Sequence, residues 1–178
     1  MKRLAAFTPL IVLLVIAASA LFVLMRGQRG EGFASPLVGK PAPALALAAL
    51  RPDAGPAPDL AGRAYVVNFF ASWCAPCELE HPLWTDLAAQ GLPIIGVAYK
   101  DRPEASAGFL ARLGDPYAFV VVDGEGRTAA DFGVRKVPES FLVGADGRIL
   151  AHASGPIDAA FIERELTPVL LGAADQAQ

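Results

Sequence analysis

The fold is decided by residues 65–77, which read YVVNFFASWCAPC. The first six are β-branched or aromatic except for Asn68, a composition typical of a short buried strand. The pair Cys74 and Cys77 follows within a few residues, and Pro76 between them suits the first turn of a helix, where its missing N–H costs nothing. The stretch therefore predicts a strand that leads directly into a helix, with Cys74 at the junction.

The helix after this junction is predicted to run from Cys74 to about Gln90. Leu79, Leu83 and Leu87 recur at intervals of four residues and predict one apolar stripe along it. Pro82 falls inside the segment and is expected to kink the helix.

The rest of the chain alternates between strand and helix patterns. The predicted elements are a strand at Leu92–Tyr99, a helix at Arg102–Leu113, a strand at Phe119–Val122, a hairpin joining Phe141–Val143 to Ile149–Ala151, and a helix from about Asp158 to Leu171. This order predicts an α/β fold with a mixed, mostly parallel sheet, an antiparallel edge and helices on both faces. Chemistry in such sheets gathers where a strand ends and a helix begins, so Cys74 marks the expected site.

The N-terminus is predicted to be a membrane anchor covering residues 1–26. Lys2 and Arg3 precede an uncharged apolar run that continues to Met25, and about 20 apolar residues suffice to cross a bilayer. A linker is expected at residues 27–36 and a single redox domain at 37–178. Ala20 ends a small-residue tripeptide that could be a cleavage site, but the apolar run continues past it, which favours a retained anchor.

Charge and cysteine content exclude several classes of protein. The net charge of −3 and the pI near 5.3 argue against nucleic-acid binding, which needs clustered positive charge. The two cysteines are too few for a disulfide framework, and no second ligand pair accompanies them for a zinc site. We therefore interpret Cys74 and Cys77 as a redox couple, with no metal and no bound cofactor.

The position of Cys74 at a helix N-terminus suits a nucleophile, because the unpaired N–H groups and the helix dipole stabilise a thiolate there. Cys77 lies one turn further on, within reach for a disulfide and expected to be more buried. Cys74 is then the attacking thiol and Cys77 the resolving thiol, with a mixed disulfide between the two steps.

Several stretches together resemble the CcmG/DsbE family of the thioredoxin-like superfamily, which acts in cytochrome c biogenesis. They are residues 73–77 (WCAPC), 80–82 (EHP), 96–101 (GVAYKD), 113–117 (LGDPY), 131–134 (DFGV) and 137–143 (VPESFLV). The resemblance implies a thioredoxin-like fold and a reductase anchored in the bacterial inner membrane with its domain in the periplasm. It implies that the CxxCH haem-attachment thiols of apocytochrome c are the target, with apocytochrome c or a cytochrome c maturation component as the partner. It also implies that a membrane thiol transporter of the DsbD or CcdA type supplies the electrons.

The resemblance also assigns residues around the redox pair. Pro138 matches the cis-proline that faces the pair in this fold, and its neighbour Val137 would present its backbone to an extended substrate. Glu80 and Glu139 match acidic residues of the family's site and are expected to accept protons or tune the thiols. Asn68 stands where thioredoxins carry a buried Asp, so we expect it to be a structural hydrogen-bonding group.

Other residues near the pair have less defined roles. Trp73 is expected either to pack over the thiols or to be a core aromatic residue, and His81 to be a surface histidine. Asp101 is either part of the site or the cap of the following helix. Arg135 and Lys136 replace an aromatic–glycine pair frequent in the family, which leaves partner selectivity open.

Three other functions remain open on the sequence. The same reducing chemistry could serve another target, as in TlpA- and ResA-like relatives, or the chain could be a general disulfide oxidase or isomerase. A membrane-tethered metallochaperone would use Cys74 and Cys77 as copper ligands. The two-residue spacing counts against the last, because copper-delivery relatives have three residues between the cysteines and a distal histidine.

Overall fold

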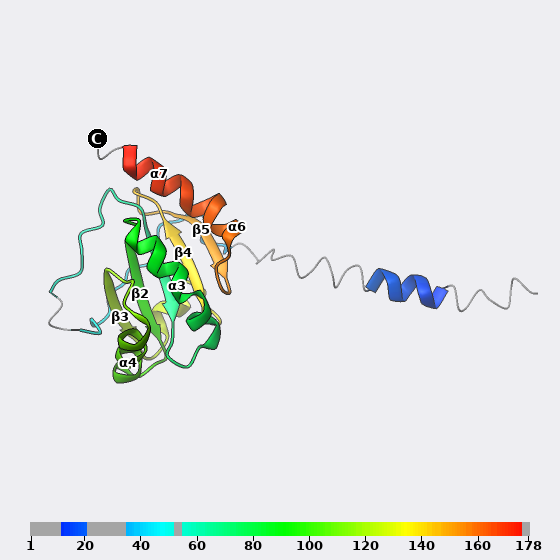
Figure 1. Ribbon diagram of the computed structural model, residues 1–178, viewed down its shortest axis with the longest axis horizontal. Helices are drawn as coiled ribbons and strands as arrows, with labels where there is room; N and C mark the ends of the chain where they lie inside the picture. Colours follow the sequence, from blue (N-terminus) through cyan, green and yellow to red (C-terminus); the bar gives the residue numbers. More distant parts are fainter. Residues whose placement is uncertain (1–11, 21–34, 52–54, 176–178) are drawn as a thin grey trace, which may run out of the picture. The chain divides into compact units, whose positions relative to one another are not determined.

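The computed structural model describes residues 12–20, 35–51 and 55–175 of the 178 in the chain (Figure 1). Residues 12–20 form a helix, and most of the predicted anchor (1–26) and linker (27–36) lies outside the described residues. Among the residues described, no helix is both long and apolar enough to span a membrane.

Five strands form one mixed sheet in the order β3-β2-β1-β4-β5. The strands are β1 (Tyr65–Phe70), β2 (Ile94–Tyr99), β3 (Phe119–Asp123), β4 (Glu139–Val143) and β5 (Ile149–Ser154). β1 pairs in parallel with β2, and β2 with β3, whereas β4 is antiparallel to both β1 and β5. The prediction of a mixed, mostly parallel sheet is therefore confirmed, but the strand that runs against the others is the interior strand β4 and not an edge strand.

The helices after β1, β2 and β5 are close to those predicted. The helices of the domain are α3 (Ala75–Ala89), α4 (Pro103–Leu113), the short α5 (Arg127–Asp131), α6 (Ala159–Phe161), the π-helical stretch η2 (Ile162–Leu166) and α7 (Thr167–Asp175). The last three form one C-terminal helical segment, which begins where the Asp158 side chain accepts a hydrogen bond from Phe161 N at 2.8 Å. The sequence pattern did not indicate α5.

Two hydrophobic clusters form the core, and β1 contributes alternate residues to each. Val66 and Phe70 belong to the larger cluster, which takes buried side chains from α3, α4 and the C-terminal segment. Val67 and Phe69 belong to the second cluster, which includes α5 residues and is flanked by Leu37, Leu45 and Leu47 of the extended N-terminal part of the domain. The sheet is thus covered on both faces, but α5 and an extended segment cover the second.

The predicted apolar stripe of α3 is wrong at its start. Leu79 is 79% exposed, and the face that packs on the sheet carries Cys77, Glu80, His81, Trp84 and Leu87. Two polar residues therefore occupy the buried face, which hydrophobic periodicity alone could not reveal. This face places Glu80 and His81 about one helical turn beyond Cys77.

Candidate active site

Cys74 and Cys77 are joined by a disulfide at the N-terminus of α3, with their Cα atoms 5.3 Å apart. Cys74 is the N-cap residue in extended conformation, and its Sγ accepts a hydrogen bond from Cys77 N at 3.2 Å. This is the helix N-terminus at which a thiolate is stabilised. The expected contrast in burial is small in the oxidised form, since Cys74 is 4% and Cys77 3% exposed.

The loop before the pair is held by Asp101, which follows β2. Its carboxylate accepts hydrogen bonds from Ser72 N at 2.7 Å, from Ser72 Oγ at 3.0 Å and from Ser106 Oγ at 2.8 Å. Partial burial opposes ionisation of Asp101, but the bonds from Ser72 and Ser106, with one from Arg102 N, outweigh it and lower the pKa of the carboxyl. Asp101 therefore anchors the redox loop, and no side-chain bond caps α4.

Trp73 is 59% exposed beside Cys74, so it is not a core residue. Its Nε1 donates to Lys100 O at 3.4 Å, a second link between the redox loop and the end of β2. The exposed indole adds an apolar surface at the residue directly before Cys74.

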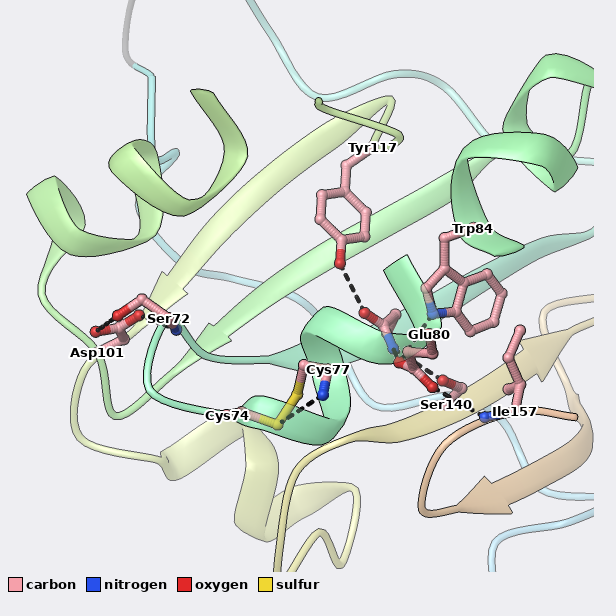
Figure 2. Close-up of a disulfide and its surroundings, with 10 residues drawn as sticks. Ser72, Cys74, Cys77, Glu80, Trp84, Asp101, Tyr117, Ser140 and Ile157 are labelled. Atoms are coloured by element: carbon pink, nitrogen blue, oxygen red, sulfur yellow. Dashed lines mark hydrogen bonds between the residues drawn. A yellow bond between two sulfur atoms is a disulfide. The ribbon is translucent and has the colours of Figure 1, made fainter. Parts of the chain in front are cut away.

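Glu80 lies one helical turn beyond Cys77 on α3 and is buried, at 2% exposure (Figure 2). One carboxylate oxygen accepts from Trp84 Nε1 at 2.9 Å and from Asn68 Nδ2 at 3.2 Å. The other accepts from Ile157 N at 2.9 Å. Burial raises the pKa of the Glu80 carboxyl, and the hydrogen bonds from Trp84, Ile157 and Asn68 lower it only in part.

Asn68 connects this carboxylate to two hydroxyl groups. Its Nδ2 donates to Ser140 Oγ at 2.9 Å as well as to Glu80, and its Oδ1 accepts from Tyr117 OH at 2.8 Å. Burial, followed by the negative charge of Glu80, raises the pKa of Tyr117 well above its usual value, so the phenol remains a neutral donor. The predicted structural role of Asn68 is confirmed by these bonds.

Glu139 lies on the other side of the sheet from Glu80. Side chains alternate along β4, so Glu139 faces the same way as Phe141 in the second cluster, and Ser140 faces Asn68. The Glu139 carboxylate accepts from His152 Nε2 at 2.9 Å and from Arg135 N at 3.3 Å. The two predicted acidic residues are therefore both buried but occupy separate environments.

The Val137–Pro138 peptide bond is cis, as the resemblance predicted. Val137 packs against both hydrophobic clusters, one of which contains Cys74 and Cys77, so this loop reaches the cluster of the redox pair. Arg135 and Lys136 on the same loop are exposed.

The prediction for His81 was wrong, and three site residues were missed. His81 is buried, with Nε2 2.9 Å from Gly114 O and its ring edge-on to Phe109. Trp84 and Ser140 were missed although helix and strand spacing from Glu80 and Glu139 could have indicated them. Tyr117 had no local signal, since it meets Asn68 from 49 residues away.

Comparisons with known proteins point to thiol–disulfide chemistry. The Redoxin family model matches residues 37–166. The thiol:disulfide interchange protein HelX of Rhodobacter capsulatus is 40% identical, over 95% of this chain and 97% of its own. DsbE of Escherichia coli is 35% identical, over 95% of each chain. A crystal structure of a thiol:disulfide interchange protein of the thioredoxin family from Chlorobium tepidum superposes with a TM-score of 0.54 at 28% identity, covering 62% of this chain and 82% of the other.

Proposed function

Because the chain belongs to the Redoxin family, and within it to the DsbE/HelX/CycY group of thiol:disulfide interchange proteins, we propose that this thiol:disulfide oxidoreductase reduces the haem-attachment cysteines of apocytochrome c. The observation that carries the proposal is the Cys74–Cys77 disulfide at the N-terminus of α3, above a buried carboxylate. The resemblance to the CcmG/DsbE family supplies the substrate class.

The reaction starts from the reduced pair. The Cys74 thiolate attacks one sulfur of the substrate disulfide, forms a mixed disulfide and releases the first substrate thiolate. Cys77 then loses its proton and attacks Cys74 Sγ, which releases the second substrate thiol and leaves Cys74–Cys77 oxidised. Two electrons pass to the substrate, and the cysteine pair carries them without a bound cofactor.

Glu80 is the proposed proton acceptor for Cys77. It is buried one turn further along α3, and burial raises the pKa of its carboxyl, which makes the carboxylate a stronger base. Asn68 and Trp84 hold the carboxylate in a fixed orientation on this face of the helix.

The exposed surface around the pair is the proposed docking site for an extended substrate. Trp73 supplies apolar area, the backbone of Val137 before the cis bond offers strand-like pairing, and Arg135 and Lys136 add positive charge at the rim. A haem-attachment segment is an unfolded stretch of chain before haem is bound, which suits a site of this form.

The setting of the reaction is part of the proposal. The predicted anchor at residues 1–26 would hold the domain at the inner membrane with the site in the periplasm. The electrons would come from a membrane thiol transporter of the DsbD or CcdA type.

The direction of the reaction is tested by equilibrating the protein with glutathione buffers. We expect a reduction potential near the roughly −270 mV of thioredoxin or modestly above it, and rapid reduction of an oxidised peptide containing Cys-x-x-Cys-His. A control peptide has the same composition but widely spaced cysteines and is expected to react more slowly. A potential near about −120 mV, typical of strong oxidants, would instead identify a disulfide oxidase.

A further inference from the structure

His152 and Glu139 form a buried pair on the face of the sheet opposite Glu80. His152 Nε2 lies 2.9 Å from Glu139 Oε2, and the two side chains are 7% and 5% exposed. His152 lies directly across the β4–β5 ladder from Phe141, and the two rings stack with their centroids 4.5 Å apart. The imidazole is therefore held by packing on one side and points its Nε2 at the carboxylate.

The surroundings of His152 determine which ring nitrogen carries the proton. Its Nδ1 is buried and has no hydrogen-bond partner among the described residues. A proton on Nδ1 would be left unpaired, and the bare Nε2 would then face a carboxylate that can only accept a hydrogen bond. The favoured tautomer thus carries its proton on Nε2 and donates it to the Glu139 carboxylate.

The second oxygen of Glu139 reaches the loop beside the redox pair. Glu139 Oε1 accepts from Arg135 N at 3.3 Å, at the start of the segment that ends in the cis-peptide bond of Val137–Pro138. The residue directly after β5 also holds the end of this loop, because Gly155 N donates to Pro138 O at 3.0 Å. β5 and the residue that follows it therefore hold the loop at both ends, Gly155 directly at Pro138 and His152 through Glu139 at Arg135.

We propose that His152 is a positioning residue for substrate binding: by fixing the Glu139 carboxylate, it sets the shape of the loop 135–138 that receives the partner polypeptide. The inference rests on the proposed function for the identity of that polypeptide, but not for the role of the loop. A carboxylate that lost its bond to His152 would keep one buried oxygen unpaired, and it would turn towards other donors and release Arg135 N. The thiols themselves are untouched by this change.

The test compares His152→Phe with His152→Gln in the full-length protein. Phe keeps a ring against Phe141 and removes the donor, whereas Gln keeps an N–H donor at about the same reach. Ile149→Val is the matched control for stability, because Ile149 is a fully buried residue of β5 in the same hydrophobic cluster.

Three quantities are measured for each variant: KM and kcat for an oxidised Cys-x-x-Cys-His peptide, the rate at which dithiothreitol reduces the Cys74–Cys77 disulfide, and hydrogen exchange at the Arg135 amide. In His152→Phe we expect KM to rise about tenfold, as for the loss of one ordinary hydrogen bond, with kcat and the dithiothreitol rate within about twofold of wild type. Exchange at Arg135 is expected to accelerate. His152→Gln and Ile149→Val should remain close to wild type in all three.

The inference is overturned if His152→Phe loses stability but keeps its KM, as a residue with only a packing role would. It is also overturned if His152→Gln behaves like His152→Phe, since the ring and not the donor would then matter. If the wild-type protein reduces insulin but not the Cys-x-x-Cys-His peptide, the proposed substrate is wrong, and the same variants are compared on insulin disulfides with the same two criteria.

Discussion

Replacing Cys77 with Ser is expected to stop turnover but to preserve the first chemical step, the attack of Cys74 on the substrate disulfide. Replacing Cys74 with Ser is expected to abolish both that attack and turnover. Cys74 is the N-cap of α3, where the helix N-terminus stabilises a thiolate, so it remains able to attack when Cys77 is absent. The serine at position 77 cannot displace the substrate from Cys74, so the mixed disulfide accumulates.

Turnover in both variants is expected to fall on the order of 10⁴-fold or more, the range seen when a covalent nucleophile is removed. Mass spectrometry of the reaction with an oxidised Cys-x-x-Cys-His peptide separates the two cases. Cys77→Ser should gain the mass of one peptide and release it on reduction, whereas Cys74→Ser should gain none. Equal trapping by the two variants would contradict the assignment of the attacking thiol.

Replacing Glu80 with Gln is expected to slow the resolving step by about 10²-fold, the lower range for loss of a general base. Burial raises the pKa of the Glu80 carboxyl, so the carboxylate is protonated at low pH and becomes a base as the pH rises through that pKa. The rate of mixed-disulfide resolution in wild type should rise across the same range, and Glu80→Gln should lack this inflection. Stopped-flow measurement of substrate release from pH 4 to 9 would show it.

Glu80→Gln is also expected to change how the free energy of unfolding depends on pH. A carboxyl whose pKa is raised in the folded state binds its proton more tightly than in the unfolded chain. The wild-type protein therefore loses free energy of unfolding as the pH rises from the unfolded value of about 4.3 through the folded value. Glu80→Gln should not show that loss, although the new amide meets the donor of Ile157 and costs about 1–3 kcal/mol at any pH.

Controls separate a base from a structural carboxylate. Ser140→Ala removes a hydroxyl of the same network that contacts Asn68 and not Glu80. We expect it to lower stability but to keep the inflection. A pH–rate profile in Glu80→Gln identical to that of wild type would leave Glu80 as a structural residue.

Local patterns predicted the parts of the fold that depend on local chemistry. The strand Tyr65–Phe70 and the helix from Ala75 follow from a β-branched and aromatic run that meets Pro76 and an N-capping cysteine. The C-terminal helical segment follows from Asp158 and its apolar periodicity. These features depend only on residues that are close together in the sequence, so local patterns are enough to predict them.

The residues that were misassigned or missed depend on contacts between distant segments. Leu79 was expected in the core because the buried face of α3 was inferred from the spacing of its leucines. Glu80 and His81 occupy part of that face instead, because they form hydrogen bonds with Ile157 N and Gly114 O. Tyr117 and His152 reach Asn68 and Glu139 from other strands or loops. No periodicity within a single element indicates such pairs.

The central claim is that Cys74 passes electrons to haem-attachment cysteines, and trapping in cells tests it most directly. Full-length Cys77→Ser would be expressed in a bacterium that makes c-type cytochromes, and its mixed disulfides isolated and identified by mass spectrometry, with Cys74→Ser as the matched control. We predict cytochrome peptides containing Cys-x-x-Cys-His, linked through Cys74, with a membrane thiol transporter as the second partner. Recovery of unrelated periplasmic proteins in place of these peptides would contradict the claim and indicate a general oxidase or isomerase.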